Sequence, residues 1–196
     1  MFRGLSLETQ ATVNPGNLFI LPKAKHLIAS TSTCTISKTG YARKIMNHLL
    51  IVFHSQSGNT ERMAKAVLSG CQQEAGVETR LLHAFDATLE NLLWADGLLF
   101  GTPENFGYMS GALKDFFDRT YYPAESYQIN LPYAIFVSAG NDGTGAVREI
   151  DRIVKGYPLR KIAEPLIAKG DLTDEHLQQC EELGHSMATG LAMGIF

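Results

Sequence analysis

The residues best suited to binding chemistry lie in one short segment, Ser55-Gln56-Ser57-Gly58-Asn59-Thr60. The segment follows an apolar run and precedes a helical pattern that starts near Glu61. A helix that begins here would point its first backbone N–H groups, which lack intrahelical partners, at an anion. The hydroxyl groups add donors, and Gly58 lets the backbone approach closely. The segment predicts a phosphate-binding loop, with an ordinary N-capped turn as the alternative.

The composition of this segment narrows the kind of phosphate that it would bind. It contains neither the GxxxxGK[ST] pattern of a triphosphate-binding loop nor the GxGxxG pattern of a dinucleotide-binding turn. It also contains no Lys or Arg. A set of neutral donors suits a single phosphate monoester held by hydrogen bonds.

The elements that must position this segment alternate along the chain. Apolar runs bounded by turn residues predict strands over 48–54, 77–83, 97–101, 133–138 and 164–168. Apolar residues at helical spacing predict helices over 61–74, 89–94, 110–121, 145–155 and 173–193. Three of the runs are almost continuously apolar, which is typical of strands buried on both faces. The alternation predicts a doubly wound α/β fold with strand order 2-1-3-4-5.

Two further loops are expected at the same edge of the sheet as residues 55–60. Ligands bind beyond the carboxyl ends of such strands, where the strand order reverses. The segments that follow the third and fourth predicted strands, 101–110 and 138–145, are rich in glycine. Both exceed the roughly 2–6 residues that connect a strand to a helix. Their lengths indicate that they contribute to a binding site.

These three segments, with the stretch 109–119, resemble the flavodoxin-like FMN proteins. The most similar members are the NAD(P)H-dependent FMN reductases and the WrbA-like NAD(P)H:quinone oxidoreductases. The resemblance covers 46–196 and none of 1–45. It implies a three-layer sandwich around a five-stranded parallel sheet of order 2-1-3-4-5.

The resemblance also implies roles for particular residues. The FMN phosphate would be held by Ser55, Ser57, Gly58, Asn59 and Thr60. The ribityl chain and one edge of the ring would be lined by Pro103, Glu104, Asn105, Phe106 and Gly107. The ring near O2 and N3 would be contacted by Ala139, Gly140, Asn141, Asp142 and Gly143. The flavin itself would carry the hydride, so no catalytic side chain and no metal are expected.

Two departures from the family pattern bear on the activity. Electron-carrier flavodoxins usually place an aromatic side chain on each face of the ring, but residues 139–145 contain none. One ring face would then be open to a nicotinamide or a quinone, which favours an enzyme over a carrier. WrbA-like proteins are longer and have a histidine near the ring, whereas 101–145 contains no histidine. This difference puts quinone reduction and tetramer assembly in doubt.

Three hypotheses for the function follow. The first is an FMN-binding oxidoreductase that passes reducing equivalents from NADH or NADPH to a quinone or similar small acceptor. The second is a flavodoxin-like electron-transfer protein, since the net charge of 46–196 is −8 and carriers dock on basic partners. The third is an interaction domain without FMN. No basic cluster for a 2′-phosphate can be placed from the sequence, so the nucleotide, the acceptor and the oligomeric state, with a homodimer as one option, stay open.

Charge, apolar run length and cysteine spacing narrow the cellular compartment and the kinds of binding partner that we expect. The acidic body disfavours nucleic-acid binding. No apolar run approaches the roughly 18 residues of a membrane span. The three cysteines are far apart in the 196-residue chain and form no CxxC, which indicates a reducing compartment such as the cytoplasm. Residues 1–45 carry a net charge of +5 and no helical or strand period, so we expect a poorly ordered extension. It is either a targeting segment or an over-long reading of a gene that starts at Met46.

Overall fold

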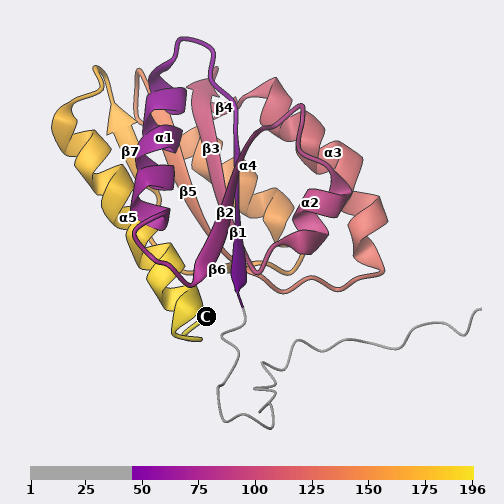
Figure 1. The fold of residues 1–196 in the computed structure, drawn as a ribbon. Helices are drawn as coiled ribbons and strands as arrows, with labels where there is room; N and C mark the ends of the chain where they lie inside the picture. Colours follow the sequence, from indigo (N-terminus) through magenta and orange to yellow (C-terminus); the bar gives the residue numbers. More distant parts are fainter. Residues whose placement is uncertain (1–45) are drawn as a thin grey trace, which may run out of the picture. The chain divides into compact units, whose positions relative to one another are not determined.

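Parallel strands form one sheet at the centre of the described chain (Figure 1). A computed structural model describes residues 46–196, so the extension expected over 1–45 lies outside the described residues. The sheet consists of β1 (Asn47–Phe53), β2 (Val77–His83), β3 (Gly97–Asn105), β5 (Pro132–Ala139), β6 (Arg160–Lys161) and β7 (Leu166–Lys169). Its order is β2-β1-β3-β5, with β6 and β7 both paired to β5. The predicted strand order is confirmed.

The fifth position of the sheet is divided between two short strands. β6 pairs with the start of β5, and β7 pairs with its end. Pro165 lies between them and has no N–H to donate to the sheet. The sequence predicted one strand over 164–168, and the structure shows an interrupted edge instead.

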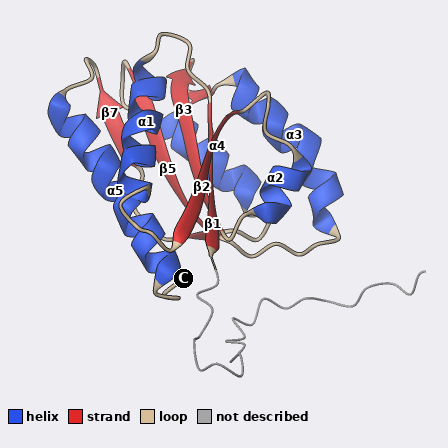
Figure 2. Ribbon diagram, viewed as in Figure 1, coloured by secondary structure: helices blue, strands red, loops and turns tan. Residues whose placement is uncertain are grey.

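Helices cover both faces of the sheet (Figure 2). One face packs against α1 (Asn59–Cys71) and α5 (Asp174–Ala192), and the other against α2 (Leu89–Trp94), α3 (Gly111–Glu125) and α4 (Thr144–Val154). Successive residues of a strand point to opposite faces. Leu49 and Ile51 accordingly lie in the α1–α5 core, while Leu50 and Val52 lie in the α2–α4 core. None of the helices within 46–196 is long and apolar enough to cross a membrane.

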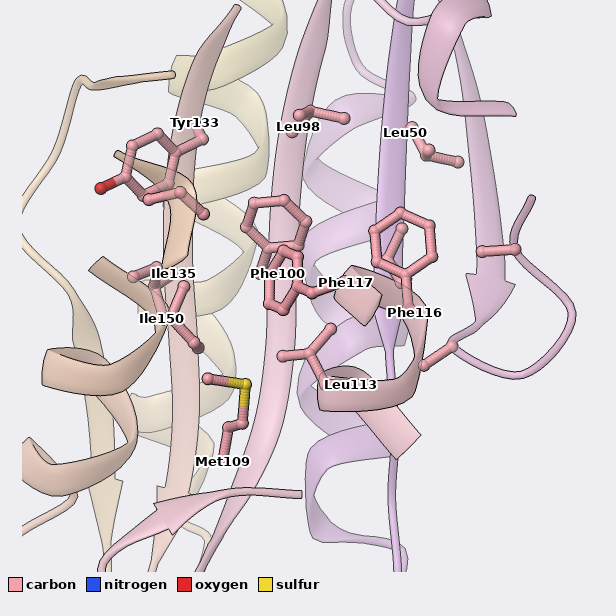
Figure 3. Close-up of a cluster of buried hydrophobic side chains, with 14 of the residues drawn as sticks. Leu50, Leu98, Phe100, Met109, Leu113, Phe116, Phe117, Tyr133, Ile135 and Ile150 are labelled. Atoms are coloured by element: carbon pink, nitrogen blue, oxygen red, sulfur yellow. The ribbon is translucent and has the colours of Figure 1, made fainter. Parts of the chain in front are cut away.

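Large side chains fix α3 onto β3. Phe100 of β3 and Phe117 of α3 are both buried, and their ring centroids are 5.1 Å apart in an edge-on arrangement. Met109 and Leu113 fill the same layer (Figure 3). This packing fixes the direction in which β3 leaves the core, and the end of β3 carries predicted site residues.

The segment 101–110 is not the loop that the sequence predicted. β3 continues to Asn105, turns at Phe106 and Gly107, and returns as the short antiparallel strand β4 (Tyr108–Met109). Both turn residues have positive φ, 53° and 72°. Two-residue hairpins favour such turns because their twist matches that of the strands. Strand-like pairing past the sheet edge explains the extra length, which the sequence analysis attributed to a loop.

The two cysteines within the described residues are buried, and we expect their thiols to be unreactive in the folded protein. Cys71 and Cys180 are fully buried, and burial raises the pKa of each thiol to about 12. Because the thiolate is the reactive form, we expect neither to react with iodoacetamide at pH 8 in the folded protein. Peptide mass spectrometry should find both alkylated only after unfolding in denaturant. Rapid modification of either in the native protein would contradict the described packing.

Candidate functional site

The three predicted binding segments meet at the carboxyl edge of the sheet (Figure 1). The N–H of His54 donates to the carbonyl oxygen of Gly101 at 3.0 Å, which places the first segment beside the end of β3. Pro103 lies opposite Ser138 in the pairing of β3 with β5. Neighbouring parallel strands therefore bring all three segments to one place.

The amino end of α1 has free donors. Its N-cap is Gly58, with φ 93° and no side-chain cap. The N–H of Gly58 itself donates to the Oγ of Ser55 at 3.1 Å, which fixes the turn before the helix. The helices α2, α3 and α5 are capped by the side chains of Thr88, Ser110 and Thr173. The first N–H groups of α4 donate to the carboxylates of Glu104 and Asp142. Among the helices of 46–196, α1 is thus left with its first N–H groups available for an anion.

Arg62 is exposed in the first turn of α1, and the other titratable side chains beside this helix end are neutral or paired. Burial, followed by the proximity of His83, lowers the pKa of His54, so its ring is neutral near pH 7. Its Nδ1 is buried and has no hydrogen-bond partner among the described residues. The carboxylate of Glu61 pairs with Lys65 at 2.7 Å, one turn further along the helix. Within 55–60 itself an anion would be held by neutral hydrogen-bond donors, because this segment contains no Lys or Arg.

Glu104 joins the second segment to the third. Its Oε2 accepts the N–H of Gly143, and its Oε1 accepts the N–H of Gly145, both at 3.1 Å. The carboxylate thus occupies the amino end of α4, where negative charge is favourable. The family resemblance implied that Glu104 lines the ring, and no local sequence pattern indicates its bonds to α4, because they span about forty residues.

Replacing the Glu104 carboxylate should weaken the connection between the end of β3 and the start of α4. We expect Glu104→Gln to lower the free energy of unfolding by about 1–2 kcal/mol, because a charged acceptor at a helix end becomes a neutral one with a single oxygen. Urea unfolding measures the change. Glu125→Gln, at an exposed position, is the matched control and should stay within about 0.5 kcal/mol of the wild type. Equal stability of both variants would contradict the role of Glu104.

The hairpin turn lies directly on the start of α4. A Cβ added to Gly145 would lie 2.1 Å from the carbonyl oxygen of Gly107. The Oδ1 of Asp142 accepts the N–H and the hydroxyl of Thr144, each at 2.8 Å, and these bonds lower the pKa of Asp142. Together with Glu104, these contacts make the second and third segments one ordered unit.

The same edge leaves open space and an exposed aromatic ring. A Cβ built on Gly58, Gly107 or Gly140 would meet no atom within 4 Å. Phe106 is fully exposed although its φ of 53° is uncommon for a bulky residue. The remaining expected residues differ in burial: Ser57, Asn141 and Asp142 are exposed, Ser55, Asn59, Pro103 and Asn105 are intermediate, and Thr60, Ala139 and Gly143 are buried.

Two residues outside the predicted site also lie at this edge. Lys169 ends β7 opposite Ala139, and its charge contributes to the lowered pKa of Asp142. Phe85 follows β2, is exposed, and lies edge-on to the ring of His54 at 6.1 Å. Their positions after predicted strands were a usable signal, since the carboxyl ends of all parallel strands share one edge.

The described chain also has hollows that extend away from the loop edge. One of about 650 Å³ lies along α4, and two others of about 420 and 310 Å³ lie beside α3.

Comparisons with known proteins agree with this geometry. Residues 83–156 match the family of NADPH-dependent FMN reductases. A solved flavodoxin from the domain Archaea superposes with a TM-score of 0.65 at 25% identity, over 74% of this chain and 98% of that one. The chain is flavodoxin-like. The resemblance inferred from the sequence is confirmed, as is the fold class.

Curated relatives of this flavodoxin-like chain fall into two kinds. A flavodoxin of Aquifex aeolicus is 44% identical over 73 residues, 37% of this chain and 40% of that protein. A probable NAD(P)H dehydrogenase (quinone) of Arabidopsis thaliana is 32% identical over 137 residues, 58% of this chain and 50% of that protein. The flavodoxin-like chain therefore spans about half the length, or less, of these relatives.

Proposed function

We propose that this protein is an FMN-binding oxidoreductase that transfers reducing equivalents from NADH or NADPH to a quinone or a similar small acceptor. The observation that carries the proposal is the uncapped amino end of α1 at the edge where three loops meet. A neutral set of donors there suits a phosphate monoester, and FMN ends in one. The match of 83–156 to NADPH-dependent FMN reductases supports the same cofactor.

The residues present fit the cofactor. The phosphate would be held by Ser55, Ser57, Gly58, Asn59 and Thr60. The open space beside Gly107 and Gly140 admits a flat ring between the hairpin turn and the third segment. Pro103, Glu104, Asn105 and Phe106 would line one side, and Ala139, Asn141, Asp142 and Gly143 the other. When bound, FMN supplies two-electron chemistry, taking a hydride from a nicotinamide and returning two electrons to an acceptor.

The protein's own residues would bind and orient the cofactor and leave one face of its ring accessible to a second molecule. The bonds from Glu104 to Gly143 and Gly145 hold the two later segments in a fixed relation before any ligand arrives. Such pre-ordering reduces the entropy cost of binding. Residues 139–145 carry no aromatic side chain that would cover a ring. An uncovered ring face would admit a nicotinamide or a quinone, and this supports an enzyme over an electron carrier.

Turnover tests the proposal. Purified protein loaded with FMN should oxidise NADH or NADPH in the presence of a soluble quinone, at a rate that depends on quinone concentration. Gly145→Ala, which disturbs the loop edge, should lose this activity. An FMN-loaded protein that oxidises neither nucleotide would contradict the proposal.

A second function is favoured by one observation. The described residues carry a net charge of −8, and an acidic surface suits docking on a basic redox partner. A relative named flavodoxin, from Aquifex aeolicus, supports this alternative. Stepwise reduction separates the two functions: a stable one-electron form supports a carrier, and a direct two-electron conversion supports the oxidoreductase.

Assembly and compartment belong to the same proposal. A homodimer is the assembly to test, and light scattering of the purified protein decides it. The buried thiols of Cys71 and Cys180 suit a reducing compartment, and we propose the cytoplasm.

A further inference from the structure

The hollow of about 650 Å³ runs along one face of α4. Its α4 wall extends from Thr144 to Lys155, and residues 164–167 form the opposite wall. A helix rises about 1.5 Å per residue, so this wall is roughly 16 Å long. The volume lies within the roughly 300–1,000 Å³ typical of small-molecule sites.

One end of the hollow adjoins the candidate flavin site. Thr144 lines it and directly follows Gly143. Ile167 lines it from the other side, and a Cβ on Gly143 would lie 2.4 Å from the Cγ2 of Ile167. A molecule that reaches the loop edge with one end can therefore extend along α4 with the other.

The hollow lies in the most basic part of an acidic domain. Residues 148–161 carry five basic and two acidic side chains, a net charge of +3, whereas 46–196 as a whole carries −8. Three of the five, Arg148, Arg152 and Lys155, line the hollow together with the acidic Asp151 and Glu164, so the lining carries a net charge of +1. Their side chains recur at helical spacing, so they share one face of α4.

Glu149 and Asp151 lie beside these cations on α4, and Glu164 lines the opposite wall of the hollow. The nearly buried Glu149 accepts from the Nε of Arg148 at 3.0 Å and lies 3.6 Å from the Nη1 of Arg152. One carboxylate between two guanidinium groups leaves a net positive charge and restrains both side chains. The carboxylate of Asp151 accepts from the hydroxyl of Tyr133 at 2.9 Å and pairs with Lys161. Arg148 and Arg152 remain 74% and 81% exposed, with unused N–H donors.

Two neighbouring guanidinium groups are a typical recognition element for a phosphate dianion. Val147, Pro165 and Ile167 give the same hollow apolar walls, which suit a base. We propose that this hollow binds the adenosine 2′-phosphate end of NADPH, with the nicotinamide end directed to the loop edge. The inference rests on the proposed function and selects NADPH over NADH. It also supplies the basic cluster that could not be placed from the sequence.

Direct binding of adenosine 2′,5′-bisphosphate to the full chain tests the site without turnover. Isothermal titration should show tighter binding of this probe than of 5′-AMP. The double variant Arg148→Gln/Arg152→Gln should weaken the bisphosphate roughly ten- to a hundred-fold and 5′-AMP much less, because two charge-assisted hydrogen bonds are lost. Arg80→Gln/Arg160→Gln removes the same charge away from the hollow and should leave binding unchanged.

Several outcomes would overturn the site. These are equal binding of the two nucleotides, unchanged binding in the Arg148/Arg152 variant, and competition by inorganic phosphate as strong as by the bisphosphate. FMN titration of the same variant separates this inference from the proposed function. Normal FMN affinity with lost bisphosphate binding supports the α4 site. Turnover with equal efficiency for NADH and NADPH would sink the α4 site while leaving the oxidoreductase intact.

Discussion

Replacing Asn59 with Glu will weaken FMN binding about a thousand-fold while the protein stays folded. Asn59 is the first residue of α1, beside the proposed phosphate position. Two unit charges about 4 Å apart near a protein surface interact by about 4 kcal/mol, which corresponds to about a thousand-fold in affinity. The same carboxylate at a helix amino end stabilises the helix by about 0.3–1 kcal/mol. Affinity and stability are thus expected to move in opposite directions.

Quenching of flavin fluorescence measures the affinity, and urea unfolding measures the stability. Asn59→Gln keeps the size of the new side chain without its charge, and its affinity should stay within about tenfold of the wild type. If Asn59→Glu binds FMN as the wild type does, the phosphate lies elsewhere. If it binds poorly because it is unfolded, the unfolding curve reveals this directly.

Gly145→Ala is expected to destabilise the protein by about 1–3 kcal/mol, the typical cost of overpacking, and to weaken FMN binding with it. The new Cβ would lie 2.1 Å from the carbonyl oxygen of Gly107, which is backbone and has no rotamer to change. The hairpin turn must move off α4, and the hydrogen bonds from Glu104 to Gly143 and Gly145 are strained with it. Helix propensity alone predicts the opposite, a gain of about 0.5–1 kcal/mol.

Gly111→Ala is the matched control for this change. Gly111 is also at the start of a helix, but a Cβ there meets no atom within 4 Å. Urea unfolding should find the control at least as stable as the wild type and Gly145→Ala clearly less stable. Similar effects of both substitutions would contradict the close contact between the hairpin turn and α4.

Periodicity was sufficient to predict the layers and the order of the sheet. The alternation of apolar runs with helical patterns predicted each main strand and helix, and right-handed crossovers then left few topologies. The division of the fifth strand at Pro165 and the β3–β4 hairpin were missed. Residues 104–109 carry no simple alternation of apolar and polar side chains, and their pairing depends on a turn in which Phe106 adopts positive φ.

The sequence predicted which segments form the site, but not the hydrogen bonds and close contacts that join them. The carboxyl-edge rule brought 55–60 to the two later segments. The bonds from Glu104 to the start of α4, and the contact of Gly107 with Gly145, join residues about forty positions apart. No local pattern encodes such contacts. The basic face of α4 was not predicted as a binding feature, because the hollow beside it depends on where 164–167 lies.

The most direct test of the central claim is an anaerobic titration of the FMN-loaded protein with NADPH. We predict that the protein binds one FMN per chain, and that about one equivalent of NADPH bleaches the visible flavin absorption band. A protein that takes up no FMN would contradict the site, and a bound flavin that stays oxidised with both NADPH and NADH would contradict the reaction.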